Sequence, residues 1–158
     1  MPTSQQTELL QEFADEIFDL SKDIWAAQTR SRGSRDQAEL SETEFLALDV
    51  LEKSERTLSV GEIQRQIGVL PAQMSRIIRS LETKGGQALI TCKINPEDKR
   101  KIDVELTPAG RKAHHAYRQL KLASIQNMLG TLNEADRQEF MRLVRQIRAS
   151  VRKSAGDK

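Results

Sequence analysis

The sequence lacks the features of disulfide-stabilised and membrane-spanning proteins. It contains one cysteine among 158 residues, so no disulfide can form within the chain, and a lone thiol favours a reducing compartment. No apolar run approaches the roughly 20 residues that cross a bilayer. Residues 1–11 are polar and lack the basic and apolar regions of a signal peptide. We therefore expect a cytoplasmic protein that has no membrane contact.

Aromatic residues are also scarce. They make up 4% of the sequence, whereas apolar residues of all kinds make up 37% and charged residues 30%. A chain of this length and composition is typical of one helix-rich domain. Its core is then expected to consist mainly of Leu, Ile, Val and Met.

The residue patterns of enzymes are missing as well. The glycine pair Gly85-Gly86 stands alone and does not form a phosphate-binding loop. His114 and His115 are the only histidines, and neighbours on a helix point about 100° apart, which does not suit a metal site. We expect these two at a dimer seam or on the surface. The sequence predicts no catalytic residue, no metal and no cofactor.

The charges are unevenly distributed. Residues 1–70 carry a net charge of −7, residues 71–101 carry +4 and residues 102–158 carry +5, although the whole chain is only +2. A basic second half suits a protein that presents one face to a polyanion. Asymmetry of this size is also common in helical proteins, so alone it leaves both interpretations open.

The most informative stretch runs from residue 70 to residue 110. Pro71 suits the first turn of a helix. An apolar stripe and a polar face then alternate at helical spacing. The stripe consists of Met74, Ile77, Ile78 and Leu81, and the polar face carries Gln73, Ser75, Arg76 and Arg79. Gly85 and Gly86 are expected to end this helix, because glycine tolerates the left-handed conformation that often follows a helix.

A β-hairpin is predicted after the glycines. Ile102, Val104 and Leu106 alternate with charged residues, which is the period of a half-buried strand. Residues 89–94 are expected to pair with this strand in antiparallel orientation, across a charged turn at residues 95–101. A helix with arginines on its outer face, followed by a basic hairpin, is the arrangement of a winged helix-turn-helix.

Further helix boundaries support this arrangement. Ser41 with Glu44 and Ser59 with Glu62 are capping boxes, each of which predicts the start of a helix. The second of these helices is expected to end near Gly68, in a tight turn that leads into the helix at Pro71.

Long amphipathic helices are predicted at both ends of the chain. The first covers about Thr7 to Arg30 and is followed by a loop at residues 31–35. Thr107 and Pro108 begin a helix that Gly130 ends, and Asn133 caps the last helix. That last helix has an apolar seam of Phe140, Val144, Ile147 and Val151. The arginines on its other side are interpreted as a solvated face or, alternatively, as a contact with DNA or a partner.

Two runs of residues resemble a known family. Asp98-x-Arg100, followed by Val104 and Leu106-Thr107-Pro108-x-Gly110, resembles the wing signature of MarR-family transcriptional regulators. The run with Leu40, Ser41, Phe45, Leu48 and Leu51 resembles the second helix of that family. The resemblance spans the whole chain, 1–158. It implies a mainly α (α+β) protein with a winged helix-turn-helix at residues 36–107 and dimerisation helices at 1–35 and 108–158.

The resemblance also implies a function. A protein of this kind is a homodimer that binds a pseudo-palindromic operator in double-stranded DNA. We expect a sequence-specific transcriptional regulator, a repressor released by a small-molecule effector, for which phenolic compounds are the candidates. The alternative is a winged-helix module that binds another protein without specific DNA binding.

The resemblance assigns the DNA-contacting positions. On the recognition helix they are Ala72, Gln73, Ser75, Arg76 and Arg79, and in the wing they are Lys93, Lys99 and Arg100. Arg76 is the best candidate for contacting a base, with a phosphate contact as the alternative. Arg100 is expected to enter the minor groove, with a solvated turn charge as the alternative. Asp98 is expected to stabilise the wing.

Three features depart from the family pattern or stay open. Leu70 stands where a capping Ser or Thr is usual, so the capping must come from elsewhere. Gly86-Gln87-Ala88 resemble an insertion of about three residues, which either shifts the wing or forms a bulge. Cys92 is followed by Lys93, which would lower a thiol pKa, but it shares a strand face with apolar neighbours. We expect a structural role for Cys92.

Overall fold

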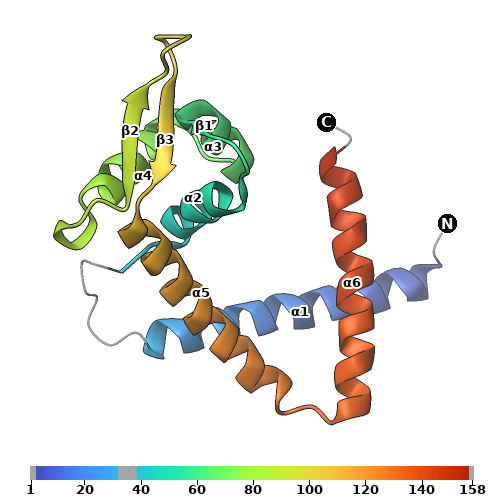
Figure 1. Ribbon diagram of the computed structural model, residues 1–158. Helices are drawn as coiled ribbons and strands as arrows, with labels where there is room; N and C mark the ends of the chain where they lie inside the picture. Colours follow the sequence, from blue (N-terminus) through green and yellow to red (C-terminus); the bar gives the residue numbers. More distant parts are fainter. Residues whose placement is uncertain (1–2, 32–38, 157–158) are drawn as a thin grey trace. The chain divides into compact units, whose positions relative to one another are not determined.

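The computed structural model describes residues 3–31 and 39–156 (Figure 1). Helices dominate the chain, and one small sheet accompanies them, so the predicted mainly α class with a winged helix-turn-helix is confirmed. The elements in chain order are α1 (Ser4–Ser31), α2 (Glu42–Lys53), β1 (Leu58–Ser59), α3 (Val60–Ile67), α4 (Pro71–Glu82), the short 3-10 helix η1 (Lys84–Gly86), β2 (Ile90–Ile94), β3 (Ile102–Leu106), α5 (Pro108–Leu129) and α6 (Glu134–Gly156).

The chain divides into two units. One contains α1 and η1, and the other contains every remaining helix and strand. None of the helices in the described part of the chain combines the length and apolar character that a membrane crossing needs.

Helix α1 extends the predicted N-terminal helix by one turn. Thr3 and Gln6 form a reciprocal cap, in which the Gln6 side chain accepts from the Thr3 amide at 3.0 Å and the Thr3 hydroxyl accepts from the Gln6 amide at 3.4 Å. The apolar stripe of α1 is exposed, with Leu10 at 62% and Ile17 at 65%. Of the predicted loop at residues 31–35, Ser31 is the last residue of α1 and the rest lies outside the described residues.

The second unit is built around one apolar core. Each of α2, β1, α3, α4, β2 and β3 contributes at least one fully buried large side chain. These side chains are Leu48, Leu58, Ile63, Met74, Leu81, Ile90 and Val104. The predicted stripe of α4 is confirmed, because its Met, one Ile and its Leu are buried and the remaining Ile is half-buried. Burial of one such side chain stabilises the fold by roughly 1.5–3 kcal/mol.

The sheet has the strand order β1-β3-β2, and both pairings are antiparallel. The predicted hairpin is confirmed, since five consecutive pairs run from Ile90 opposite Leu106 to Ile94 opposite Ile102. In Figure 1 the tip of this hairpin projects beyond the neighbouring helices α2, α3 and α4. Strand β1 was not predicted, because two residues are too few to show strand periodicity. Its Leu58 lies opposite Val104 at the centre of the sheet.

The segment between α4 and β2 resolves the apparent insertion. Gly85 (φ 59°) and Gly86 (φ 78°) adopt the left-handed conformation predicted for them, just after α4 ends at Glu82. The Leu89 amide then donates to the Leu81 carbonyl at 2.8 Å, which ties the start of β2 to the end of α4. The apparent insertion at residues 86–88 precedes the first pair of the hairpin, Ile90 opposite Leu106, so it lies outside the paired strands.

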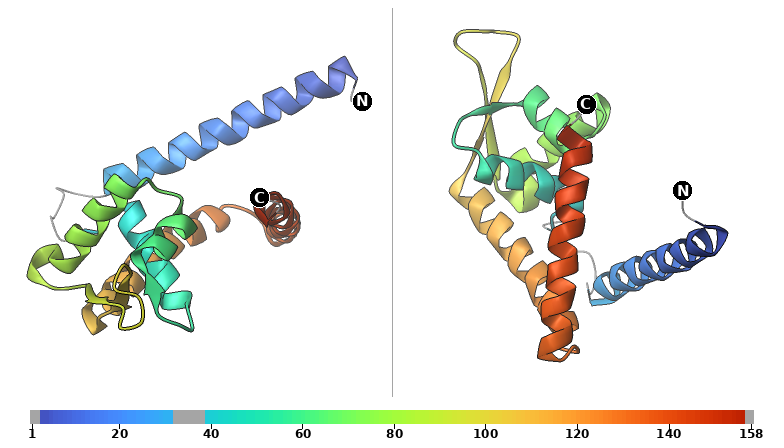
Figure 2. Two further views of the ribbon diagram at one scale, coloured as in Figure 1. Left: turned by 90° about the horizontal axis from the view of Figure 1, so that it is seen from above. Right: turned by 90° about the vertical axis from the view of Figure 1, so that its right-hand side faces the viewer.

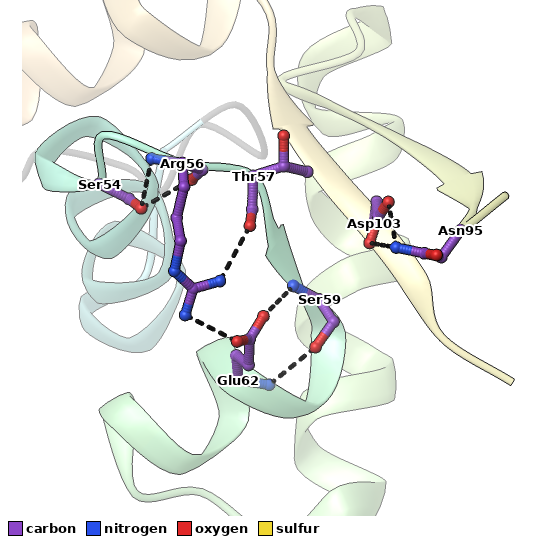
Figure 3. Close-up of polar contacts among 7 residues, drawn as sticks. All are labelled: Ser54, Arg56, Thr57, Ser59, Glu62, Asn95 and Asp103. Carbon is purple, nitrogen blue, oxygen red and sulfur yellow. Dashed lines mark hydrogen bonds and ion pairs between the residues drawn. The ribbon is translucent and has the colours of Figure 1, made fainter. Parts of the chain in front are cut away.

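Both predicted capping boxes are present. In the second, the Ser59 hydroxyl accepts from the Glu62 amide at 3.3 Å, and the Glu62 carboxylate accepts from the Ser59 amide at 2.8 Å (Figure 3). The Arg56 guanidinium donates to the other carboxylate oxygen at 2.7 Å. The bond from Arg56, together with the Ser59 amide, lowers the pKa of Glu62 to about 2.

This lowered pKa predicts a pH dependence of stability. A carboxyl whose folded-state pKa is depressed contributes stability above its unfolded pKa of about 4.3, and that contribution is lost as the pH falls toward 2. Glu62→Gln should therefore destabilise the protein at pH 7 and cost progressively less between pH 4.5 and 2. Urea unfolding of both proteins at several pH values measures this. Equal destabilisation across that range would contradict the assignment, and Glu55→Gln, at an exposed carboxylate, is the control.

Helix α5 starts against the base of the hairpin. The Thr107 hydroxyl caps it by accepting from the Gly110 amide at 3.0 Å, as predicted, and also donates to the Ala88 carbonyl at 2.6 Å. Gly110 lies so close to the residue before β2 that a Cβ atom there would be 2.0 Å from the Leu89 carbonyl oxygen. A side chain at this position is therefore incompatible with the observed packing.

The two histidines do not form the predicted seam or surface pair. His115 is exposed, but His114 is only 7% exposed, and its Nε2 lies 2.9 Å from an Asp49 carboxylate oxygen. Its ring also stacks on Phe45, with 5.0 Å between the centroids. Partial burial acts to raise the pKa of Asp49, but hydrogen bonds from Lys53 and His114 outweigh it and lower that pKa. His114 is thus a buried link between α5 and α2, and the prediction for it was wrong.

The C-terminal boundaries agree with the sequence. Gly130 follows the last residue of α5, and the Asn133 side chain accepts from the Asp136 amide at 2.9 Å at the start of α6. Helix α6 then runs to Gly156, and its apolar side chains are largely exposed, with Ile147 at 59% and Val151 at 62% (Figure 2 gives two further views of this helix).

Candidate nucleic-acid interface

A tight turn joins α3 to α4. Gly68 ends α3 in the left-handed conformation (φ 69°), and its amide donates to the Gln64 carbonyl at 3.0 Å. Pro71 then occupies the first turn of α4. Leu70, the N-cap residue, makes no side-chain capping bond and is 74% exposed. The predicted helix-turn-helix is therefore present, and its second helix begins without a side-chain cap.

The outer face of α4 carries the residues predicted for DNA contact. All of them are exposed, namely Ala72, Gln73, Ser75, Arg76 and Arg79. The Ser75 hydroxyl donates to the Pro71 carbonyl at 3.2 Å. Within the described part of the chain, the side chains of Gln73, Arg76 and Arg79 have no hydrogen-bond or ion-pair partner. Their donors are available to a ligand, and packing of the opposite face fixes the helix that carries them.

The cationic residues of the wing differ in their exposure and in the ion pairs that they form. Lys93 on β2 forms an exposed ion pair with Glu105 on β3, at 3.5 Å. Lys99 is exposed at the turn. The Arg100 side chain is 97% exposed, and its Nε lies 3.8 Å from an Asp98 carboxylate oxygen. Arg100 and Lys99 are thus both well exposed, whereas Lys93 is partly neutralised by its neighbour.

Side-chain hydrogen bonds order the wing turn. Asp98, expected to stabilise the wing, accepts a hydrogen bond from the Arg100 amide at 3.1 Å. Asn95 and Asp103 also take part, because the Asn95 amide nitrogen lies 3.0 and 3.2 Å from the two Asp103 carboxylate oxygens (Figure 3). These two residues were not predicted from the sequence. The available signal was an Asn before Pro at the start of a turn, where Asn side chains often bind the following backbone.

Cys92 lies on the strand face that packs toward the core. It is half-buried, and burial, with a smaller effect from Glu82, raises the pKa of its thiol to about 11. Lys93 therefore does not activate it, and the thiolate needed for oxidation is scarce at neutral pH.

A further prediction concerns peroxide. We expect micromolar hydrogen peroxide to leave DNA binding of the wild-type protein unchanged, and Cys92→Ser to behave in the same way, because the thiol stays protonated. Binding titrations before and after treatment test this, with dithiothreitol reversal as the control. Peroxide-induced release that disappears in Cys92→Ser would contradict the prediction.

Groups of acidic, histidine and cysteine side chains that could hold a metal ion are not found among the described residues. The arrangement instead offers an exposed donor face on α4 and a cationic turn on an ordered hairpin. Both features suit a polyanion more than a small electrophile or a metal.

Comparisons with known proteins agree with this geometry. Residues 40–102 match the model of the MarR family. No protein of curated function matches the sequence.

Several solved structures share the fold. YusO from Bacillus subtilis is 20% identical with a TM-score of 0.71, and the match covers 94% of this chain and 99% of that chain. FabT from Streptococcus pneumoniae, solved in complex with DNA, is 18% identical with a TM-score of 0.66, and the match covers 93% and 98%. BpsR from Bordetella bronchiseptica, whose DNA binding is regulated by 6-hydroxynicotinic acid, is 21% identical with a TM-score of 0.58, and the match covers 84% and 98%. At these identities the likeness establishes the fold.

Proposed function

We infer the function from the match of residues 40–102 to the MarR family model, because proteins of that family regulate transcription. We propose that this chain is a sequence-specific DNA-binding regulator, and that it represses its target genes. The observation that carries the proposal is the outer face of α4, where Gln73, Arg76 and Arg79 are exposed and uncommitted. Amide and guanidinium groups are the donors that distinguish adenine and guanine in the major groove.

The wing supplies the second contact in this proposal. Arg100 is almost fully exposed at the hairpin tip, where it can enter the minor groove beside the major groove that α4 occupies. Lys99 and Lys93 would contact phosphates, Lys93 after exchanging its Glu105 partner. Ala72 and Ser75 would lie against the DNA without a strong contact of their own.

We further propose that the protein acts as a homodimer. The apolar stripes of α1 and α6 are exposed in the single chain, and exposed apolar surface of this kind is a mark of protein contact. Helices at residues 1–35 and 108–158 would form the dimerisation region, and residues 36–107 the DNA-binding region. Two identical recognition helices require a pseudo-palindromic operator with half-sites about one DNA turn apart.

Release by a small molecule is the remaining part of the proposal. BpsR, which has the same fold, is regulated by 6-hydroxynicotinic acid, and phenolic acids are the ligand class that we would test first here. The alternative function is a winged-helix module that binds another protein. The two differ in their response to salt, because DNA affinity falls steeply with ionic strength and an apolar protein interface does not.

Substitutions of two arginines separate the two kinds of DNA contact. Arg76→Ala should cost about 1–3 kcal/mol and relax base preference at one position of each half-site. Arg100→Ala should weaken binding to many sequences alike and lower the salt slope by about one unit per monomer. The operator would come from selection of bound duplexes from a random pool, followed by titrations against it and its point variants.

Arg118→Ala on α5 is the matched control, because it removes an exposed arginine outside the winged elements and should leave binding unchanged. If Arg76→Ala and Arg100→Ala both bind like the wild type, the assigned surface is wrong. If the wild type selects no DNA sequence from the random pool, the result supports the alternative function, a winged-helix module that binds another protein.

A further inference from the structure

We propose that Asn95 and Asp103 are positioning residues that fix the wing turn so that Arg100 is held in place for DNA. This inference rests on the proposed function and adds to it two residues that do not themselves contact DNA.

Every hydrogen-bonding atom of the Asn95 side chain is used. Its amide nitrogen donates to the Asp103 carboxylate at 3.0 and 3.2 Å. Its carbonyl oxygen accepts from the backbone amides of Glu97 and Asp98, both at 2.9 Å. Its own backbone amide donates to the Lys101 carbonyl at 2.9 Å and closes the turn. One side chain thus joins the hairpin tip to a strand.

Asp103 is a firm anchor for this contact. It lies on β3, the central strand of the sheet, where it pairs with Lys93 on one side and with Ser59 on the other (Figure 3 shows it beside Asn95). A position held by two neighbouring strands moves less than one in a free turn.

The hydrogen bonds continue from Asn95 to Arg100. The Asp98 amide is held by Asn95, the Asp98 carboxylate accepts from the Arg100 amide at 3.1 Å, and the Asp98 carbonyl accepts from the Lys101 amide at 2.9 Å. Because the Arg100 side chain is 97% exposed, packing does not orient it. Its starting point is set by this backbone network, which reduces the ordering that DNA binding must otherwise supply.

The pair requires one amide and one carboxylate. Asn95→Asp would place two carboxylates at hydrogen-bonding distance, where they repel each other. Combining it with Asp103→Asn reverses the donor and the acceptor and restores the contact with the net charge of the wild type. The exchanged pair is therefore a conservative rescue that a loss of charge or of fold would not mimic.

The experiment measures the affinity of the full-length protein for one duplex, the tightest selected by the wild type from a random pool, at fixed salt. Asn95→Ala and Asn95→Asp should each weaken binding on the order of tenfold. Asn95→Asp/Asp103→Asn should recover to within about threefold of the wild type. In Asn95→Ala, amide exchange should accelerate in the wing turn and stay unchanged in α4. Glu97→Gln, at an exposed turn residue, controls for general changes at the tip.

A double-mutant cycle tests whether Asn95 acts through Arg100. Asn95→Ala/Arg100→Ala should bind no more than about twofold more weakly than Arg100→Ala alone, because the positioned side chain is already absent. Additive losses, or an exchanged pair as weak as Asn95→Asp, would overturn the proposal. A wild-type protein that selects no duplex would instead overturn the proposed function and, with it, any role of the wing in DNA binding.

Discussion

Gly110→Ala should destabilise the protein by at least about 3 kcal/mol, which for a chain of this size lowers the melting temperature by about 6–12 °C. The added methyl carbon would be 2.0 Å from the Leu89 carbonyl oxygen and 3.0 Å from a Leu106 methyl group. The carbonyl cannot withdraw freely, because it accepts a hydrogen bond from the Thr107 amide. The substitution would separate α5 from the base of the hairpin.

Gly61→Ala is the matched control for this measurement. Gly61 lies in the first turn of α3, where an added methyl would meet only a flexible arginine side chain, Arg65, at 3.7 Å. Replacing a helical glycine without a clash usually stabilises by about 0.4–1 kcal/mol. Thermal unfolding of both variants should therefore give changes of opposite sign. A Gly110→Ala protein as stable as the wild type would show that α5 does not pack on β2 as described.

Ile147→Glu should convert the proposed dimer into monomers and weaken operator binding on the order of 100-fold or more. Ile147 is 59% exposed in the single chain and shares the apolar seam of α6 with Phe140 and Val151. In the proposed dimer this seam is buried, so a carboxylate there would lose its hydration without gaining a partner. A monomer binds only one half-site, so it loses the increase in affinity that comes from two linked DNA-binding regions binding two half-sites.

Sedimentation and DNA titration at the same protein concentrations would separate the two effects. Gln146→Glu is the control, because it adds the same charge at the neighbouring position, which faces away from the seam and lies beside Arg142. It should stay dimeric and bind normally. If Ile147→Glu remains a dimer at micromolar concentration, then α6 is not part of the dimer interface.

The sequence predicted the parts of the fold that follow local rules. Capping boxes at Ser41 and Ser59 begin helices because both partners lie within one turn of chain, and the stripe of α4 follows from helical spacing alone. The hairpin was predictable because alternation in β3 requires no knowledge of other elements. The candidate face of α4 follows directly from that stripe, since its residues lie opposite the buried ones.

The features that were missed depend on distant parts of the chain. His114 is buried because it meets Asp49, which lies 65 positions earlier. Strand β1 exists because β3, more than forty residues later, offers it a partner. Asn95 meets Asp103 across the hairpin only in the register that the strands adopt. Periodicity and capping rules contain no information on contacts between residues that are distant in the sequence.

The contact between His114 and Asp49 has a mechanical consequence. It joins α5 to α2 close to the start of α5, where the ring is also stacked on Phe45. The 15 residues of α5 that follow His114 form a rod about 22 Å long, so a tilt of about 5° around this joint would move its far end by about 2 Å. A small change of angle at the fixed end thus becomes a displacement of more than half the spacing between base pairs, which is about 3.4 Å. In the proposed dimer, the stiffness of this joint would therefore limit how accurately two copies of the protein set the distance between their recognition helices.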